Sequence, residues 1–293
     1  MTIVLGDNQY GKAETHLVRI TKGGPGGAWH EIKDVTVSIA LGGDFAASHL
    51  SGDNSRVVPT DTQKNTVFAF AREASVGEIE DFGLRLGRHF AREFESVRRA
   101  RVVLQEQAWQ RVEVDGQPHP HAFIAAGDEK RIAIVTSTRE ADWVVAGIDD
   151  LYVLKSTGSE FWGFPRDRYT TLAETHDRVL ATRVRARWRY QHAEVKFGES
   201  FVEARRSLIE AFAAKHSLAL QQTLYAMGEA VLRARPDIAE IRLAMQNRHH
   251  FTVDLSPFGL ENDQEVFYAA DRPFGLIEGT VTRDETTPAD HAW

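Results

Sequence analysis

The residues best suited to chemistry lie in the segment LKSTGSEFWGFPRDRYTTL, residues 154–172. It carries adjacent aromatic rings at Phe161 and Trp162 and a Gly-Phe-Pro turn signal, and Arg178 follows shortly after it. This composition predicts a long irregular connection between regular elements. Loops that present aromatic and arginine side chains on a rigid scaffold are typical of sites that bind flat, polar molecules.

Two residues in the first half of the chain could take part in proton transfer. Lys12 follows Gly11 at the start of a predicted strand. It can accept a proton only where burial or neighbouring charges lower its pKa, and most single lysines are solvated surface charges. Thr60 opens a predicted helix, and with Gln63 three residues later it matches a capping box. Thr60 is therefore either an ordinary helix cap or a hydroxyl that binds a ligand where the helix start favours anions.

Two polar side chains in the second half could hold a planar ligand. Arg178 follows Asp177, so it either forms an ion pair with that or a nearby carboxylate, or it provides a bidentate clamp. Gln221 lies in the first turn of a predicted helix. It is either solvated there, or its amide pairs with one edge of a base-like ring.

The histidines do not predict a metal site. In NRHHF, residues 247–251, strand alternation places Asn247 and His249 on one face and His250 on the other, so the two histidines cannot easily share one metal. His119 and His121 have ligand-like spacing, but the prolines beside them mark a turn. The chain has no cysteine and no Walker-type or dinucleotide-type glycine fingerprint. We expect neither a metal ion nor a bound cofactor.

The elements that position these residues follow the same order twice, strands, two helices and strands, with a period of roughly half the chain. In the first half the patterns predict strands at 10–21 and 28–42, helices at 61–75 and 77–96, and strands at 99–114, 119–126 and 130–139. In the second half they predict strands at 141–156 and 178–195, helices at 199–215 and 218–235, and strands at 238–245, 249–255 and 275–283.

One predicted strand, residues 182–190, has arginines on one face and apolar residues on the other. The arginines are Arg183, Arg185, Arg187 and Arg189. Such alternation fits a sheet with one face against helices and one face in water. The arginine face either meets an anionic neighbour or a solvent channel, or it is an ordinary solvated face.

Composition narrows the classes of partner. The 293 residues carry a net charge of −7, which does not favour a nucleic-acid binder. No apolar run approaches the roughly 18 residues of a membrane span. The first residues lack the layout of a signal peptide and the last four, DHAW, are no peroxisomal signal, so we expect a cytoplasmic protein.

Seven ordered windows together make the chain similar to the urate oxidase (uricase) family, bacterial type. They are NQYGK, VPTDTQKNT, LKSTGSEFWGFPRD, TLAETHDR, LQQTLY, NRHHF and EVFYAADRPFGLIEGTV. The resemblance implies an α+β fold of two tandem tunnelling-fold (T-fold) domains, 1–139 and 140–293, each an antiparallel sheet with helices on its outer face. It also implies that the sheets close into a barrel in a homotetramer, with active sites between subunits.

The resemblance also implies the reaction, a cofactor-independent oxidation of urate by dioxygen to 5-hydroxyisourate and hydrogen peroxide. Its matched positions give Arg178 and Gln221 as the purine clamp, Phe161 as the stacking ring, Leu172 and the Leu220 backbone as pocket wall, and Asn247 as the holder of dioxygen or water. Lys12, Thr60 and His249 would form the proton relay. Asp61 would support the site, and the neighbouring subunit would contribute it together with Lys12 and Thr60.

Three positions depart from the common family pattern: Pro59, Gln246 and Arg248. They bear on affinity and rate more than on the reaction. The alternative is another T-fold enzyme, or a non-catalytic protein, that binds a purine or pterin. Zinc-dependent T-fold enzymes rely on cysteine and histidine ligands, which the absence of cysteine disfavours.

Overall fold

The computed structural model describes residues 1–293 apart from the side chains of Asp271 and Asp290. The chain divides into two compact units. The first holds residues 1–147, 189–199 and 287–293, and the second holds residues 148–188 and 200–286. The domain boundary expected after residue 139 stays a prediction.

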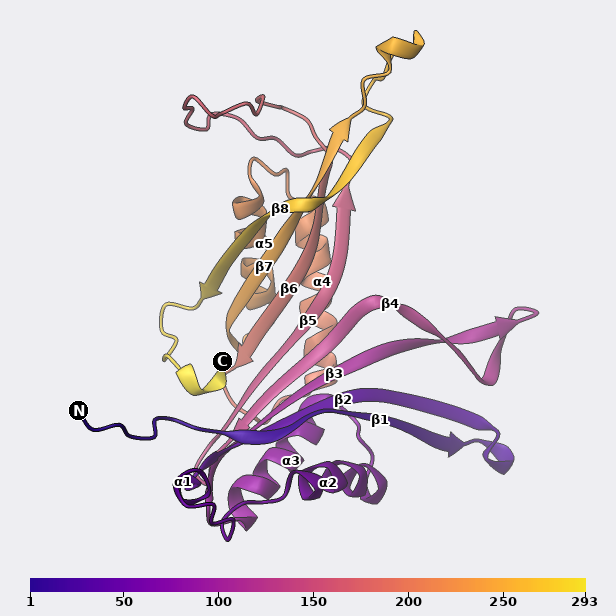
Figure 1. The fold of residues 1–293 in the computed structure, drawn as a ribbon. Helices are drawn as coiled ribbons and strands as arrows, with labels where there is room; N and C mark the ends of the chain where they lie inside the picture. Colours follow the sequence, from indigo (N-terminus) through magenta and orange to yellow (C-terminus); the bar gives the residue numbers. More distant parts are fainter. The chain divides into compact units, whose positions relative to one another are not determined.

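The first unit is an antiparallel sheet covered by helices on one face (Figure 1). Its strands pair in chain order and are β1 (Tyr10–Gly23), β2 (Trp29–Gly43), β3 (Val97–Val114) and β4 (Gln117–Ser137). The helices are α1 (Ala46–Leu50), α2 (Thr60–Glu73) and α3 (Ile79–Glu93). The apolar face of α3, with Phe82, Leu86 and Phe90, is fully buried together with inward residues of β2 such as Val35 and Val37. Burial of these two apolar faces against each other fixes which sheet face the helices cover.

The second unit repeats this order. It is built mainly from β5 (Asp142–Lys155), β6 (Leu180–Tyr190), α4 (Phe197–Ala214), α5 (Leu220–Ala234), β7 (Ile238–Thr252) and β8 (Phe267–Thr282), with the strands again adjacent in chain order. Helix α5 packs on β7 and β8. The predicted repeat of strands, two helices and strands is therefore confirmed, and the α+β class with it.

Four details differ from the sequence expectations, the first being that β8 begins at Phe267 and not at residue 275. The predicted strands 119–126 and 130–139 are one strand, β4, which continues through Gly127 at a positive φ of 89°. Glycine adopts this conformation without strain, so it marks an irregularity inside the strand and not its end. The strands predicted at 238–245 and 249–255 are likewise one strand, β7. Helix α1 was not predicted because five residues are too few for a periodic signal.

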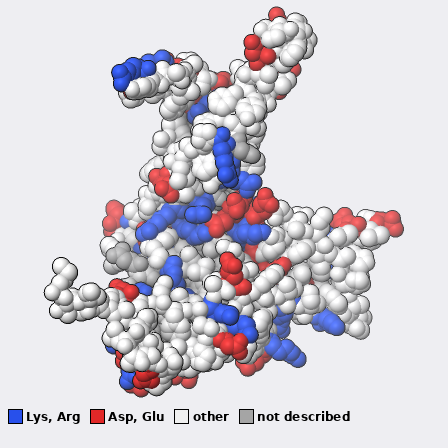
Figure 2. All heavy atoms as spheres, viewed as in Figure 1, with Lys and Arg blue, Asp and Glu red and all other residues white. Residues whose placement is uncertain are grey.

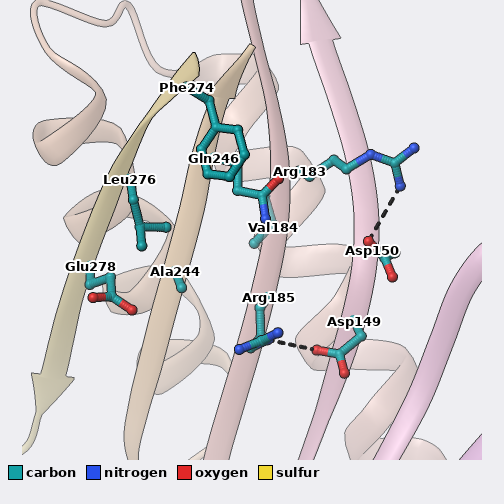
Figure 3. Close-up of a pocket in the computed structure, with 10 residues that line it drawn as sticks. All are labelled: Asp149, Asp150, Arg183, Val184, Arg185, Ala244, Gln246, Phe274, Leu276 and Glu278. Carbon is teal, nitrogen blue, oxygen red and sulfur yellow. Dashed lines mark hydrogen bonds and ion pairs between the residues drawn. The ribbon is translucent and has the colours of Figure 1, made fainter. Parts of the chain in front are cut away.

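The arginine strand, β6, has the predicted alternation as far as Trp188, but Arg189 departs from it because this arginine is buried and donates to the Thr287 carbonyl at 3.0 Å. Val184, Ala186 and Trp188 are buried, whereas Arg185 is exposed. The anionic neighbours are aspartates of β5: Arg183 lies 3.3 Å from Asp150, and Arg185 and Arg187 lie 3.2 and 2.7 Å from Asp149. Figure 3 shows two of these pairs in a cavity of about 220 Å³, opposite Phe274 and Leu276 of β8. Acidic and basic side chains are likewise interspersed on the face of the molecule seen in Figure 2.

In the part of the chain that the structure describes, no helix has the length and apolarity needed to cross a membrane. The same residues contain no group of three or more histidine, aspartate or glutamate side chains arranged to hold a metal ion.

Candidate active site

A cavity of about 320 Å³ in the second unit brings together five of the residues expected at the site. This volume suits a small planar ligand. Its wall comes from the connection between β5 and β6, from the end of β7, and from the segment leading into β8. The expected residues on it are Phe161, Leu172, Arg178, Asn247 and His249.

The connection between β5 and β6 presents Phe161 through a short antiparallel bridge. Phe161 and Thr175 exchange two backbone hydrogen bonds, of 2.8 and 3.0 Å, although they are 14 positions apart in the chain. The ring of Phe161 stacks against that of Phe164, with centroids 5.1 Å apart. These contacts hold an aromatic face at the cavity wall although the surrounding segment has no regular structure.

Arg178 lies at the wall as a half-buried cation. Its guanidinium carbon is 5.2 Å from the centre of the Phe161 ring, and its Nε lies 3.4 Å from the Ser159 hydroxyl. Asp177 does not pair with it, because that carboxylate accepts hydrogen bonds from the Thr157 hydroxyl and the Gly158 amide, at 2.8 and 3.2 Å.

No described carboxylate lies within ion-pair distance of Arg178. Burial lowers the pKa of its guanidinium, which nevertheless stays charged at neutral pH. The ion pair considered as an alternative is therefore absent among the described residues. The cavity contains a positive charge that can pair with an anionic ligand.

Asn247 and His249 reach the cavity from the end of β7. Burial, the Arg178 charge and the neighbouring His250 lower the pKa of His249, so the ring is neutral and can accept a proton at neutral pH. His250 also contributes to the wall, although strict alternation predicts the opposite face. The pairing with β8 is irregular at this point, where Asn247 pairs with Gly275 but His249 pairs with Ala270.

The other expected relay residues lie together in the first unit. Tyr10 of β1 ties the strand start to the segment before α2, because its hydroxyl accepts a 2.7 Å hydrogen bond from the Val58 amide and donates one of 3.1 Å to the Val58 carbonyl. Next to it, Gly11 permits close pairing with β2, since a Cβ there would lie 1.8 Å from the Ile39 carbonyl oxygen. The half-buried Lys12 follows directly.

Thr60 begins α2 but does not cap it. The cap residue is Pro59, and it forms no side-chain cap hydrogen bond. Gln63 does not complete a capping box either, since its side-chain amide donates to the Val58 carbonyl at 3.3 Å. The capping alternative for Thr60 is therefore wrong, and among the described residues its exposed hydroxyl has no hydrogen-bond partner.

The positive charges of two lysines affect the Asp61 carboxyl. The Lys64 ammonium chiefly lowers the pKa of the Asp61 carboxyl, and the Lys12 charge lowers it further. Asn65 also donates to Asp61, at 2.9 Å. Thr60 and Asp61 are adjacent in the first turn of α2, and the Lys12 charge influences the Asp61 carboxyl.

Two expected residues do not reach the cavity wall. Leu220 is buried and Gln221 is exposed in the first turn of α5, as the solvated alternative predicts. Their contact with a ligand stays a prediction. Sequence reasoning also missed Ser159 and Thr175, which hold Arg178 and Phe161. Both fall inside the windows that carry the family resemblance, but nothing in their spacing marks them.

Gln246 and Arg248, which flank Asn247, interact with each other. The Arg248 guanidinium donates to the Gln246 side-chain oxygen at 3.2 Å and lies over the Phe274 ring at 5.3 Å from its centre. Their side chains do not line the cavity that holds Asn247.

Comparison with known proteins gives consistent matches along the chain. The family model described as Uricase matches residues 8–136 and again 144–278. The uricase of Arthrobacter globiformis is 53% identical over 99% of this chain and 93% of its own length. The uricase of Dictyostelium discoideum is 37% identical over 96% of this chain and 98% of its own length. The crystal structure of the Arthrobacter globiformis uricase superimposes with a TM-score of 0.93, at 52% identity, over 99% of this chain and 98% of that one.

Proposed function

Because the chain belongs to the uricase family, we propose that it is a urate oxidase that converts urate, dioxygen and water into 5-hydroxyisourate and hydrogen peroxide. The observation that carries this proposal is the half-buried Arg178, which has no described carboxylate partner and faces a cavity shared with Phe161, Asn247 and His249. A flat anion rich in carbonyl and N–H groups complements this wall.

We infer that the chain holds the purine ring from its edge and its face. Arg178 donates hydrogen bonds to one edge of the ring. The Gln221 amide, in the first turn of α5, completes the clamp by pairing with the bound ligand. Phe161 stacks on the ring, while Leu172 and the Leu220 backbone bound it. Rigid placement of the reactants supplies much of the rate enhancement in such a reaction.

Proton removal is assigned to Lys12, Thr60 and His249. The exposed Thr60 hydroxyl connects Lys12 to the substrate in this relay, and Asp61 supports the site. His249 is neutral because of its lowered pKa, so it can accept a proton at the other end of the relay. Asn247 would hold dioxygen, and then water, against the ring.

The substrate itself supplies the electrons. Dioxygen reacts slowly with most closed-shell molecules, and oxidases commonly use a metal or flavin for that reason. A urate anion that has lost a second proton is electron-rich enough to reduce dioxygen directly. We therefore expect activity without an added metal or cofactor.

The two groups of residues belong to different units, which supports a site shared between chains. Lys12, Thr60 and Asp61 lie in the first unit, whereas the cavity lies in the second. We propose a homotetramer in which each site takes its relay from the neighbouring subunit.

Subunit exchange tests this assembly. Inactive Lys12→Ala and Arg178→Ala chains are mixed under conditions that reassort subunits. A hybrid interface pairs an intact Lys12 of one chain with an intact Arg178 of the other, so partial activity is expected. No recovery after hybrids are demonstrated by native mass spectrometry would contradict a shared site.

The reaction is tested by adding urate to the protein in air and following the loss of its ultraviolet absorbance together with peroxide. Consumption of urate with release of peroxide is the expected result, and unchanged urate contradicts the proposal. No specific observation favours a pterin or a non-catalytic role. A cytoplasmic location stays a prediction, to be checked by cell fractionation.

A further inference from the structure

The Glu160 carboxylate, next to Phe161 but outside the cavity wall, connects two parts of the second unit. Its Oε1 lies 2.6 Å from His216 Nε2, in the connection between α4 and α5. Its Oε2 accepts a 2.7 Å hydrogen bond from the Trp162 indole and lies 3.4 Å from His176 Nδ1. These hydrogen bonds lower the pKa of Glu160, so the group is ionised at neutral pH.

The backbone on either side of this pair is joined as well. The Glu160 amide donates to the Ser217 carbonyl at 2.7 Å, and the Ser217 amide donates to the Gly158 carbonyl at 2.9 Å. The fully buried Ser217 hydroxyl then lies 2.6 Å from that of Thr223, which is also fully buried and belongs to the first turns of α5. The connection that presents Phe161 is therefore bound to the start of the helix that carries Gln221.

The same segment holds Arg178. Ser159, fully buried between Gly158 and Glu160, lies 3.4 Å from Arg178 Nε through its hydroxyl. Residues 158–161 thus include Phe161 and contact Arg178, the two wall residues that would hold the substrate ring. The same segment is hydrogen-bonded to the α4–α5 connection.

We propose that Glu160, paired with His216, is a positioning residue that sets the Phe161 ring and the Arg178 guanidinium in register with Gln221 at the start of α5. This inference rests on the proposed function, because it names the residue that orients the urate clamp. Glu160 lies outside the cavity wall and does not touch the substrate. It acts through the residues on either side of it.

A purely stabilising role is the competing explanation, and the exposure of the pair argues against it. The His216 side chain is 58% exposed and that of Glu160 is 18% exposed. Ion pairs with one partner in water contribute little to stability. Since a small misplacement of a binding group can reduce catalysis strongly, the effect of this pair is expected in the kinetics.

The first test separates KM from kcat in four variants. Glu160→Ala is expected to lower kcat/KM about tenfold or more, chiefly through KM, because a misplaced clamp weakens binding of the ring. His216→Ala is expected to act similarly, and the double variant to be no worse than either single one, because the two side chains act as one unit. Glu160→Gln keeps an oxygen that accepts from Trp162 or His216, and it should restore kcat/KM to within about threefold of the parent protein.

Glu229→Ala is the matched control. Glu229 lies on α5 and pairs with Arg233 at 2.8 Å, in an exposed position away from the cavity. Its loss should leave KM unchanged. If Glu160→Ala also leaves KM unchanged, or if it lowers only the melting temperature, the positioning role is wrong. If the losses of kcat/KM in Glu160→Ala and His216→Ala add up in the double variant, the two side chains do not act as one unit, and the proposal is wrong.

Hydrogen exchange provides a readout that does not depend on activity. Peptides covering the amides of Glu160 and Phe161 should exchange faster in Glu160→Ala than in the parent protein and in Glu229→Ala. Unchanged exchange overturns the inference. A parent protein that does not consume urate refutes the proposed function, whereas an active parent protein with unaffected Glu160 variants refutes only the positioning role.

Discussion

Replacing Arg178 with alanine removes the charge on which the proposed clamp depends. The guanidinium is half-buried at the cavity wall, without a described carboxylate partner, so bound urate is expected to provide its anion. Truncating one partner of a buried, hydrogen-bonded charge pair costs about 2–5 kcal/mol. That corresponds to a Kd weaker by roughly 30-fold to several thousand-fold.

Anaerobic titration with urate measures this loss directly, because binding proceeds without oxidation when dioxygen is excluded. Arg178→Lys keeps the charge but loses the bidentate geometry, and it should bind with intermediate affinity. Arg185→Ala is the matched control. It removes an arginine from a different cavity of the same unit, where Asp149 is its partner (Figure 3), and it should bind urate like the parent protein.

If Arg178→Ala binds urate within about threefold of the parent protein, a difference of less than about 1 kcal/mol, Arg178 is not the clamp. Equal losses in Arg178→Ala and Arg185→Ala would also refute this assignment, because they would point to general electrostatic attraction of urate instead of a clamp at this cavity.

Two further predictions concern the first unit. Thr60→Ala should reduce turnover strongly but change the free energy of unfolding by less than about 0.5 kcal/mol, because Thr60 does not cap α2. Loss of a true cap costs about 1 kcal/mol. A urea denaturation curve that shows a loss of that larger size would contradict this prediction. Burial raises the pKa of Glu80, which pairs with Arg131 at 2.7 Å, from its ordinary value of 4.5 to about 7. Its protonation therefore stabilises the fold fully below pH 4.5, and this contribution is lost as the pH rises through about 7. Denaturation curves of the parent protein and Glu80→Gln between pH 5 and 8 should diverge by up to about 3 kcal/mol, and parallel pH profiles would show that Glu80 does not titrate in this range.

The regular elements could be predicted from the sequence because each carries its own periodic signal. The helix face of α3 and the alternation in β2 are local patterns, and both are found where they were expected. The single strands β4 and β7 were divided because Gly127 and the polar residues 246–248 interrupt the pattern. Pairing with a neighbouring strand carries the chain through such interruptions, and this tertiary effect has no local signature.

The site was only partly predictable for the same reason. Phe161, Arg178, Asn247 and His249 meet in one cavity although they span almost 90 positions, and no spacing rule brings them together. These four residues were assigned to the site from the family resemblance and not from their spacing. The supporting residues Ser159 and Glu160 were not singled out, since a serine or glutamate in a connection has many possible partners and only the fold selects one.

The most direct test of the proposed function is the stoichiometry of the reaction in protein freed of metals and cofactors. The protein is dialysed exhaustively against a chelator, shown to lack flavin by its absorbance spectrum, and mixed with urate in air-saturated buffer, while urate, dioxygen and peroxide are measured together. We expect one urate and one dioxygen to disappear for each hydrogen peroxide formed, at the rate of the untreated protein. Loss of this activity on chelation, with recovery when one metal ion is returned, would contradict this expectation.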